Sequence, residues 1–141
     1  MKYKFSFIAF LFIAVVLTTI RLMVPPKNII TYDVLGLYAY LPATFIYHDP
    51  APEDFTQFQE LITTYNSTPT LYQFSQAENG RWVIRFFSGI SIMYSPFFAG
   101  GHIYALNSDY PPDGFSKPYQ WALIIAGIFY TLLGIYILRK I

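Results

Sequence analysis

Residues 31–48, TYDVLGLYAYLPATFIYH, form the stretch around which the rest of the chain is organised. The stretch opens with a single acid, Asp33, and then runs aromatic and apolar without a charge until Asp49. Its apolar residues recur at helical spacing, which predicts a helix over about residues 33–48 with one apolar face. We expect Asp33 at the N-cap, and we expect Pro42 to kink or end the helix because proline has no amide hydrogen. A helix this apolar, close to a membrane span, is typical of the bilayer interface.

The composition of the chain places it among membrane proteins. Only 12% of its 141 residues are charged, whereas about a quarter of an average soluble domain is charged. Its 13 tyrosines are typical of a protein that lies along a membrane–water boundary. The net charge of +1 gives no indication of nucleic-acid binding. There is no cysteine, so we expect neither a disulfide framework nor a thiolate metal site.

Two segments are long and apolar enough to span a bilayer. Residues 5–24 carry one charge, Arg21, and at about 1.5 Å per residue they cover the roughly 30 Å hydrocarbon layer. Residues 119–138 carry no charge and are followed by Arg139 and Lys140. The first run is longer than the apolar part of a signal peptide and offers no small-residue cleavage site, so we expect a retained transmembrane anchor.

Charges near the ends of the two spans predict an orientation. Four cations lie on the side of the termini, residues 1–4 and 139–141, against three on the other side, and positive charge favours the cytoplasm. All eight acids lie in the loop formed by residues 25–118. We therefore expect a multi-pass protein of the cell (inner) membrane, with both termini cytoplasmic and the loop extracytoplasmic.

The extracytoplasmic loop is expected to hold a second interfacial helix and a small β-hairpin. Residues 86–106 are uncharged, and Pro96 in their middle favours a broken, interfacial or re-entrant helix, with a third span as the alternative. The hairpin is expected over about residues 71–86, with a turn at Asn79-Gly80. The predicted fold class is an α-helical membrane protein in which two transmembrane helices flank this loop.

Three cations are candidate phosphate-binding residues. Arg81 and Arg85 alternate with apolar residues, so both belong to one face of a strand that could hold a phosphate, and a solvated hairpin face is the alternative. Lys117 stands just before the second span and is the third candidate. The two histidines, His48 and His102, have no spacing that makes a metal site, so no metal-binding residue is predicted.

Three blocks of sequence carry a resemblance to a known class of membrane enzyme. They are residues 33–43 (DVLGLYAYLPA), residues 94–98 (YSPFF) with His102, and residues 113–120 (DGFSKPYQ). With the two spans, these blocks resemble a group of uncharacterised bacterial integral membrane proteins. Beyond that group, the arrangement resembles the amino-terminal part of a GT-C glycosyltransferase, the class related to protein mannosyltransferases and lipid A aminoarabinose transferases. The resemblance covers most of residues 30–140.

This resemblance implies a function and a catalytic residue. GT-C enzymes place a long extracytoplasmic loop after their first span, take sugar from a polyprenyl-phosphate donor, and carry an early acid as catalytic base or metal ligand. Asp33 occupies the place of that acid here. An aspartate can deprotonate an acceptor hydroxyl or coordinate a divalent metal ion. The alternative is that Asp33 only caps its helix.

The chain also departs from the GT-C pattern. Those enzymes often have a second acid beside the first, where Val34 stands here, and they have eight or more spans. We therefore expect an amino-terminal fragment that is inactive alone and that contacts membrane lipid and partner helices from missing or separate spans. The alternative is a small two-span scaffold or subunit, whose extracytoplasmic module and apolar faces bind a partner.

Overall fold

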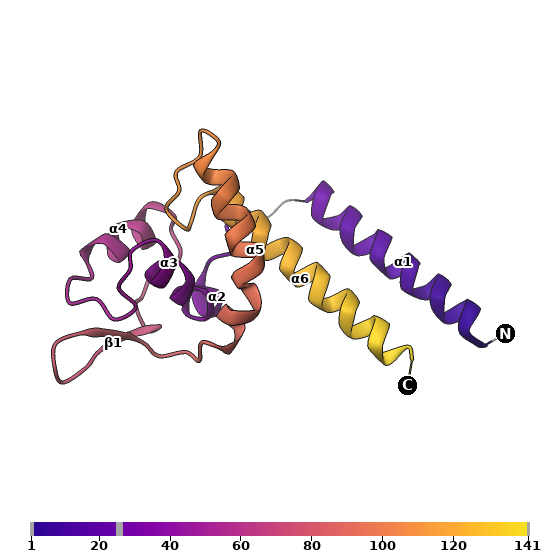
Figure 1. Cartoon of the computed structure of the whole chain (residues 1–141), viewed down its shortest axis with the longest axis horizontal. Coiled ribbons are helices and arrows are strands. Elements are labelled where there is room, and N and C mark those ends of the chain that lie inside the picture. Colours follow the sequence, from indigo (N-terminus) through magenta and orange to yellow (C-terminus); the bar gives the residue numbers. More distant parts are fainter. Residues whose placement is uncertain (1, 25–26, 141) are drawn as a thin grey trace. The chain divides into compact units, whose positions relative to one another are not determined.

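The computed structural model describes residues 2–24 and 27–140, and most of these residues are helical (Figure 1). Residues 1 and 141, which belong to the predicted cytoplasmic termini, and residues 25–26, at the start of the predicted loop, lie outside the described residues. The chain divides into two compact units. We call Asn28–Leu123 the module, and we call Met1–Lys27 together with Ile124–Ile141 the helix pair.

The helix pair consists of α1, Lys2–Met23, and the greater part of α6, Lys117–Leu138. Among the described residues, these are the two helices that are long and apolar enough to cross a membrane, at the positions predicted from the sequence. The ring of Phe10 lies 6.1 Å from that of Tyr136, so the start of α1 lies beside the end of α6. No residue in the most apolar window of α1 is buried.

The central stretch of the module forms two short helices, α2 (Tyr32–Tyr38) and α3 (Tyr40–Phe45), which meet at Ala39. The break lies three residues before Pro42, whose ring would clash with the preceding turn of a straight helix, so the predicted kink is confirmed. Five apolar residues of this stretch are buried in the module (Leu35, Tyr38, Ala39, Leu41, Ala43), whereas Val34 and Phe45 of the predicted apolar face are 36% and 56% exposed. The predicted face is therefore only partly used by the core, and an interfacial position for residues 33–48 stays a prediction.

The core of the module is built from aromatic rings. Tyr38 and Phe115 are both fully buried and meet edge to face at 6.3 Å, and Phe98 packs on Tyr38 at 6.0 Å. On its other side Phe115 stacks on Tyr65 at 5.8 Å and touches Phe58. Burying a side chain of this size contributes about 2 to 3 kcal/mol. The core thus joins segments that are far apart in the sequence.

A short helix and two strands cover one part of this core. α4, Thr56–Thr64, buries Phe58 and Ile62. The strands β1 (Phe74–Gln76) and β2 (Trp82–Ile84) pair antiparallel with Phe74 opposite Ile84, inside the segment predicted as a hairpin. Gly80 in the connecting turn has a φ of 84°, a left-handed conformation that glycine adopts without strain.

α5, Gly89–Leu106, is a continuous helix with Pro96 inside it, so the predicted break at Pro96 is wrong. Proline cannot donate to the carbonyl four residues earlier, that of Ile92. The hydroxyl of Ser95 donates to this carbonyl instead, at 2.7 Å, which satisfies the acceptor that the proline leaves free.

One face of α5 packs within the module and another faces outward. On the inner face, Ser91 donates a hydrogen bond to the carbonyl of Leu37. Gly101 lies so close to α6 that an added Cβ would stand 3.1 Å from the Cβ of Ala122. The outward side chains, which we call the outer stripe, are all apolar or aromatic and 60 to 69% exposed (Ile92, Ile103, Tyr104, Leu106). The module therefore leaves one apolar helix face uncovered.

Candidate functional site

Asp33 lies in the first turn of α2 and is exposed. The residue at the N-cap is Thr31, which makes no side-chain capping bond, so the prediction that Asp33 caps the helix is wrong. Its Oδ1 instead accepts a hydrogen bond from the hydroxyl of Tyr72 at 2.6 Å. This bond raises the pKa of Tyr72 above its ordinary value, because the ionised phenol would lose it and would face the carboxylate. Asp33 is therefore a surface acid held by a phenol from a distant segment.

A strained residue sets the position of Asp33. Tyr32 has a φ of 47°, which is uncommon for a residue other than glycine. The peptide groups around it are held on both sides, because its N–H donates to the carbonyl of Ser67 at 3.1 Å and its carbonyl accepts from Nε2 of Gln73 at 3.0 Å. Ser67 and Gln73 are themselves buried. The module thus fixes the backbone that carries Asp33.

Arg85 joins Asp33 through the same tyrosine. Its Nη1 lies 3.4 Å from the carbonyl oxygen of Tyr72, and its backbone N–H donates to the carbonyl of Gln73 at 2.9 Å. We call Asp33, Tyr72 and Arg85 the Asp33 cluster. All three side chains are exposed, and together they present a carboxylate, a phenol and a guanidinium. Tyr72 carried no signal in the sequence, because nothing in its neighbourhood indicates a partner 39 residues away.

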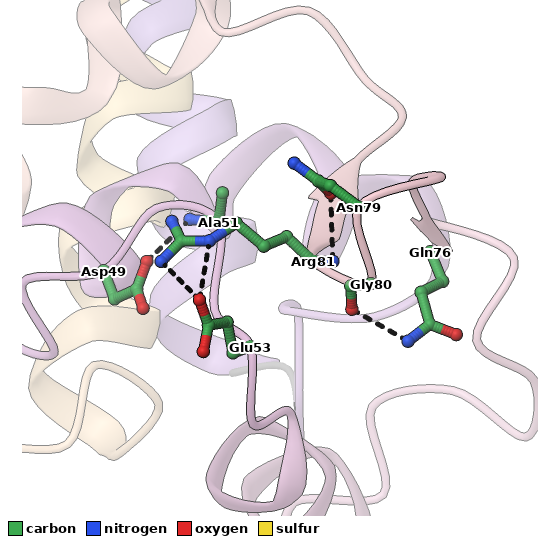
Figure 2. Close-up of polar contacts among 7 residues, drawn as sticks. All are labelled: Asp49, Ala51, Glu53, Gln76, Asn79, Gly80 and Arg81. Atoms are coloured by element: carbon green, nitrogen blue, oxygen red, sulfur yellow. Dashed lines mark hydrogen bonds and ion pairs between the residues drawn. The ribbon is translucent and has the colours of Figure 1, made fainter.

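Arg81 forms an ion pair outside the Asp33 cluster. Its Nη2 and Nε lie 3.1 and 3.2 Å from Oε1 of Glu53, and Figure 2 shows the guanidinium reaching from the start of β2 to this carboxylate. The two residues line an open depression of about 330 Å³ together with Asp49 and Asp54. Three carboxylates around one guanidinium disfavour an anion, so this depression does not suit a phosphate.

Lys117 opens α6 and is exposed. Within the described ranges, no hydrogen bond or ion pair joins it to the Asp33 cluster. Of the three cations predicted to bind phosphate, Arg85 is the one that contacts Tyr72, the residue whose hydroxyl bonds to Asp33.

A divalent metal ion does not fit the residues around Asp33. Hard cations such as Mg²⁺ and Ca²⁺ need several oxygen ligands, usually including more than one carboxylate. Asp33 contacts a phenol that donates to it, and residues 2–24 and 27–140 contain no group of three or more acidic, histidine or cysteine side chains that could hold a metal. The metal role that the GT-C resemblance implies is not supported here.

Asp113 accepts more side-chain hydrogen bonds than any other acid of the module, a role that its sequence neighbourhood does not indicate. Its Oδ1 accepts from the backbone N–H groups of Phe115 and Ser116, at 2.8 and 2.9 Å, and its Oδ2 accepts from the hydroxyl of Tyr65 at 2.5 Å. Its carbonyl accepts from the hydroxyl of Tyr47 at 2.9 Å. Burial, with Asp113 as a second cause, raises the pKa of Tyr47 to about 12. Asp113 is thus an internal anchor for the turn that begins block 113–120.

Gln120 is the second residue in that block with an internal role. Its Oε1 accepts from the N–H groups of Ile29 and Ile30, at 2.8 and 3.3 Å, while its Nε2 donates to Oδ1 of Asn28 at 2.9 Å. These hydrogen bonds, which we call the Asn28–Gln120 clasp, join the start of the module to a residue near its end. The clasp explains a buried polar side chain at the start of an apolar helix.

No protein-family model, curated protein or solved structure matches this chain. The resemblance to GT-C glycosyltransferases therefore stays a prediction that rests on the three sequence blocks. The structure gives the first and third blocks a shared packing role, because the hydroxyl of Tyr38 donates to the carbonyl of Gly114 at 2.5 Å and Pro42 lies against the same glycine. These other residues of the two blocks hold the module together, whereas Asp33, the first residue of the first block, is exposed.

The Asp33 cluster is therefore a site whose carboxylate and guanidinium are exposed and are not used in the core of the module. A carboxylate there can accept a proton from a hydroxyl, and the guanidinium of Arg85, which contacts the backbone of Tyr72, can pair with a phosphate oxygen. The described residues provide no enclosed cavity over the cluster, so both groups are open to solvent.

Proposed function

We propose that this chain is an integral membrane protein with α1 and α6 as its two spans and the module on the extracytoplasmic side of a bacterial inner membrane. The apolar side chains of α1 support this proposal, since Phe5, Phe12 and Met23 are 69 to 77% exposed and would be costly to leave in water. The pairing of Phe10 with Tyr136 supports it further, because a chain that crosses twice brings its two ends to one side. The cation majority at those ends favours the cytoplasm.

Reporter fusions test this topology. A reporter fused after Gly80, in the exposed turn between β1 and β2, should be active only outside the cytoplasm, and a reporter fused after residue 141 only inside. If both reporters fall on the same side of the membrane, the two-span proposal is wrong.

Within this topology, we propose that the chain is the amino-terminal part of a GT-C-like glycosyltransferase that uses a polyprenyl-phosphate sugar donor. The observation that carries the proposal is the Asp33 cluster, which joins an exposed acid and an exposed arginine through one tyrosine. In this scheme the Asp33 carboxylate takes the proton of an acceptor hydroxyl, whose oxygen bonds to the anomeric carbon of the sugar. The bond from that carbon to the phosphate oxygen breaks, and the polyprenyl phosphate leaves with the bonding electrons near Arg85.

The chain is expected to be inactive by itself. Positioning of the base, donor and acceptor supplies much of the rate of such a reaction, and exclusion of water protects the reacting groups. Asp33 and Arg85 are exposed in the module, so further spans would have to cover them. Purified chain should therefore show no sugar transfer, with or without added divalent ions.

Donor binding gives a sharper test than activity. The chain is reconstituted in lipid vesicles with a photoreactive polyprenyl-phosphate sugar, and labelling of the module is measured. Arg85→Gln should reduce labelling several-fold, whereas Arg81→Gln should leave it unchanged, because Arg81 already pairs with Glu53. Equal labelling of the two variants would remove Arg85 from the proposed site, and absence of labelling in the inserted wild-type chain would contradict the glycosyltransferase proposal.

The outer stripe of α5 favours a second candidate function, that of a two-span scaffold or subunit. An uncovered apolar helix face suits a helix of a partner protein. In cells, a photoreactive residue at Ile103 should then crosslink to one defined protein, and a residue at Gln59 on the polar face of α4 should not. Crosslinks to lipid alone would reject this candidate.

A further inference from the structure

An arginine that takes no part in the Asp33 cluster, Arg139, directly follows the end of α6. In the helix pair, the Cζ atom of Arg139 lies 4.9 Å from the ring centroid of Phe7 and 5.5 Å from that of Tyr136. Both distances are within the range of a cation–π contact. One ring comes from each helix, so the guanidinium helps to join the start of α1 to the end of α6.

Two nitrogens of this guanidinium lack an acceptor. Nε and Nη1 of Arg139 are buried, and neither has a hydrogen-bond partner within residues 2–24 and 27–140. Ring faces attract the charge but accept no conventional hydrogen bond from these N–H groups. Arg139 as a whole is half-buried, but these two N–H groups are removed from water without an acceptor, which is costly, so an anion of matching geometry would relieve that cost.

The helix pair has no acidic side chain to supply that anion. All eight acids of the chain lie between Asp33 and Asp113, within the module. A second cation stands next to the first, because Nζ of Lys140 lies 5.0 Å from the ring of Tyr136. The anion must therefore come from outside the acidic side chains of the helix pair.

We propose that Arg139, with Lys140, binds the phosphate of an anionic membrane lipid. A guanidinium pairs with a phosphate through two parallel hydrogen bonds, and the rings of Phe7 and Tyr136 restrict the orientation of its plane. Basic groups between helices at the end of a span are suited to lipid head groups. This inference rests on the proposed membrane insertion, which puts the end of α6 at the depth of the head groups.

Lipid retention measures this binding. The full chain is extracted in mild detergent from membranes that contain phosphatidylglycerol and phosphatidylcholine, and bound lipids are counted by native mass spectrometry. Arg139→Gln should lower the retained phosphatidylglycerol about tenfold, since charge-assisted hydrogen bonds are lost. Arg21→Gln removes an exposed arginine near the other end of α1 and should leave retention within about twofold of wild type. Phe7→Leu should give an intermediate loss.

Three further measurements decide between explanations. Inorganic phosphate at millimolar concentration should not displace the lipid, and displacement would show a site for free phosphate instead. A short neutral extension after residue 141 moves the terminal carboxylate away, and retention that changes with it as strongly as with Arg139→Gln would overturn the proposal.

Alkaline extraction reports insertion separately. An extractable chain contradicts the membrane proposal, whereas an inserted chain with equal retention in wild type and Arg139→Gln contradicts only the lipid site.

Discussion

The module and the helix pair are both rich in apolar and aromatic residues, but the two regions use them differently. In the module, tyrosine rings are packed inward and their hydroxyls donate to defined carbonyls and carboxylates, as those of Tyr38, Tyr47 and Tyr65 do. In the helix pair, most of the large side chains face outward, and the rings of Phe7, Phe10 and Tyr136 make the contacts between the helices. The comparison shows that composition alone does not separate a packed core from a pair of exposed apolar helices, whereas the placement of polar partners does.

The largest expected effect is the difference in stability between alanine substitutions at two glycines, Gly114 and Gly127. Gly114→Ala in the module should lower the free energy of unfolding by about 3 kcal/mol or more, because φ is 87° and the added Cβ would stand 2.6 Å from the Cβ of Pro42. Gly127→Ala in α6 is the matched control, since nothing lies within 4 Å of its added Cβ. Thermal unfolding of both variants in detergent, followed by circular dichroism, measures the difference. Similar stabilities would mean that the module packs less tightly than described.

A second prediction concerns the internal anchor. Asp113→Ala removes the acceptor of the Tyr65 hydroxyl and of two backbone N–H groups, so we expect a loss of about 2 to 3 kcal/mol. Asp109→Ala removes an exposed acid four residues earlier and should change stability by less than about 0.5 kcal/mol. Chemical denaturation of the two variants gives the comparison. If Asp113→Ala is as stable as Asp109→Ala, the carboxylate is not an anchor.

High pH should weaken the module. The pKa of Tyr47 is raised to about 12 in the fold, so the unfolded chain releases this proton at lower pH than the folded chain. The stabilising contribution is full below about pH 10 and falls as the pH rises toward about 12, and for a half-exposed tyrosine we expect a loss of about 1 kcal/mol.

Denaturation at about pH 9 and about pH 12 measures this decline, with Tyr47→Phe as the control. The variant should lose less stability over the same range because it has no proton to release at this position. An identical decline in both proteins would assign the pH dependence to other groups, such as Tyr38 and Tyr65, whose pKa values burial also raises.

The smallest effect is expected in the helix pair. Phe12→Ala changes a side chain that is 69% exposed on α1, so the stability of the module should stay within about 0.5 kcal/mol of wild type. Near-ultraviolet circular dichroism reports on the aromatic core during unfolding. A loss comparable to that of Asp113→Ala would show that α1 supports the module directly.

The sequence predicted the two long helices well because their signal is local. α1 and α6 are uninterrupted apolar runs whose length alone indicates a span, and their observed bounds lie within about three residues of the predicted ones. The kink before Pro42 was predicted for the same reason, since the missing amide hydrogen is a property of one residue. Pro96 behaves differently because its neighbour Ser95 satisfies the carbonyl of Ile92, a compensation that depends on a side-chain rotamer.

The candidate site was harder to predict, because its partners are distant in the chain. Asp33 was singled out by its isolation among apolar residues, but Tyr72 and the strained backbone at Tyr32 become visible only when the chain is folded. Arg81 and Arg85 look equivalent in the sequence, and the fold pairs one with Glu53 and brings the other to Tyr72. The Asp113-Gly114 pair stood out only as the start of block 113–120, since a single sequence does not reveal which side chains this carboxylate will contact.

The Asn28–Gln120 clasp also has a mechanical consequence. It joins two positions 92 residues apart that are the points where the chain enters and leaves the module. Tension that draws α1 and α6 apart would therefore act on these amide hydrogen bonds before it reaches the aromatic core. A lateral force would separate the two ends of the module while its aromatic core stays intact.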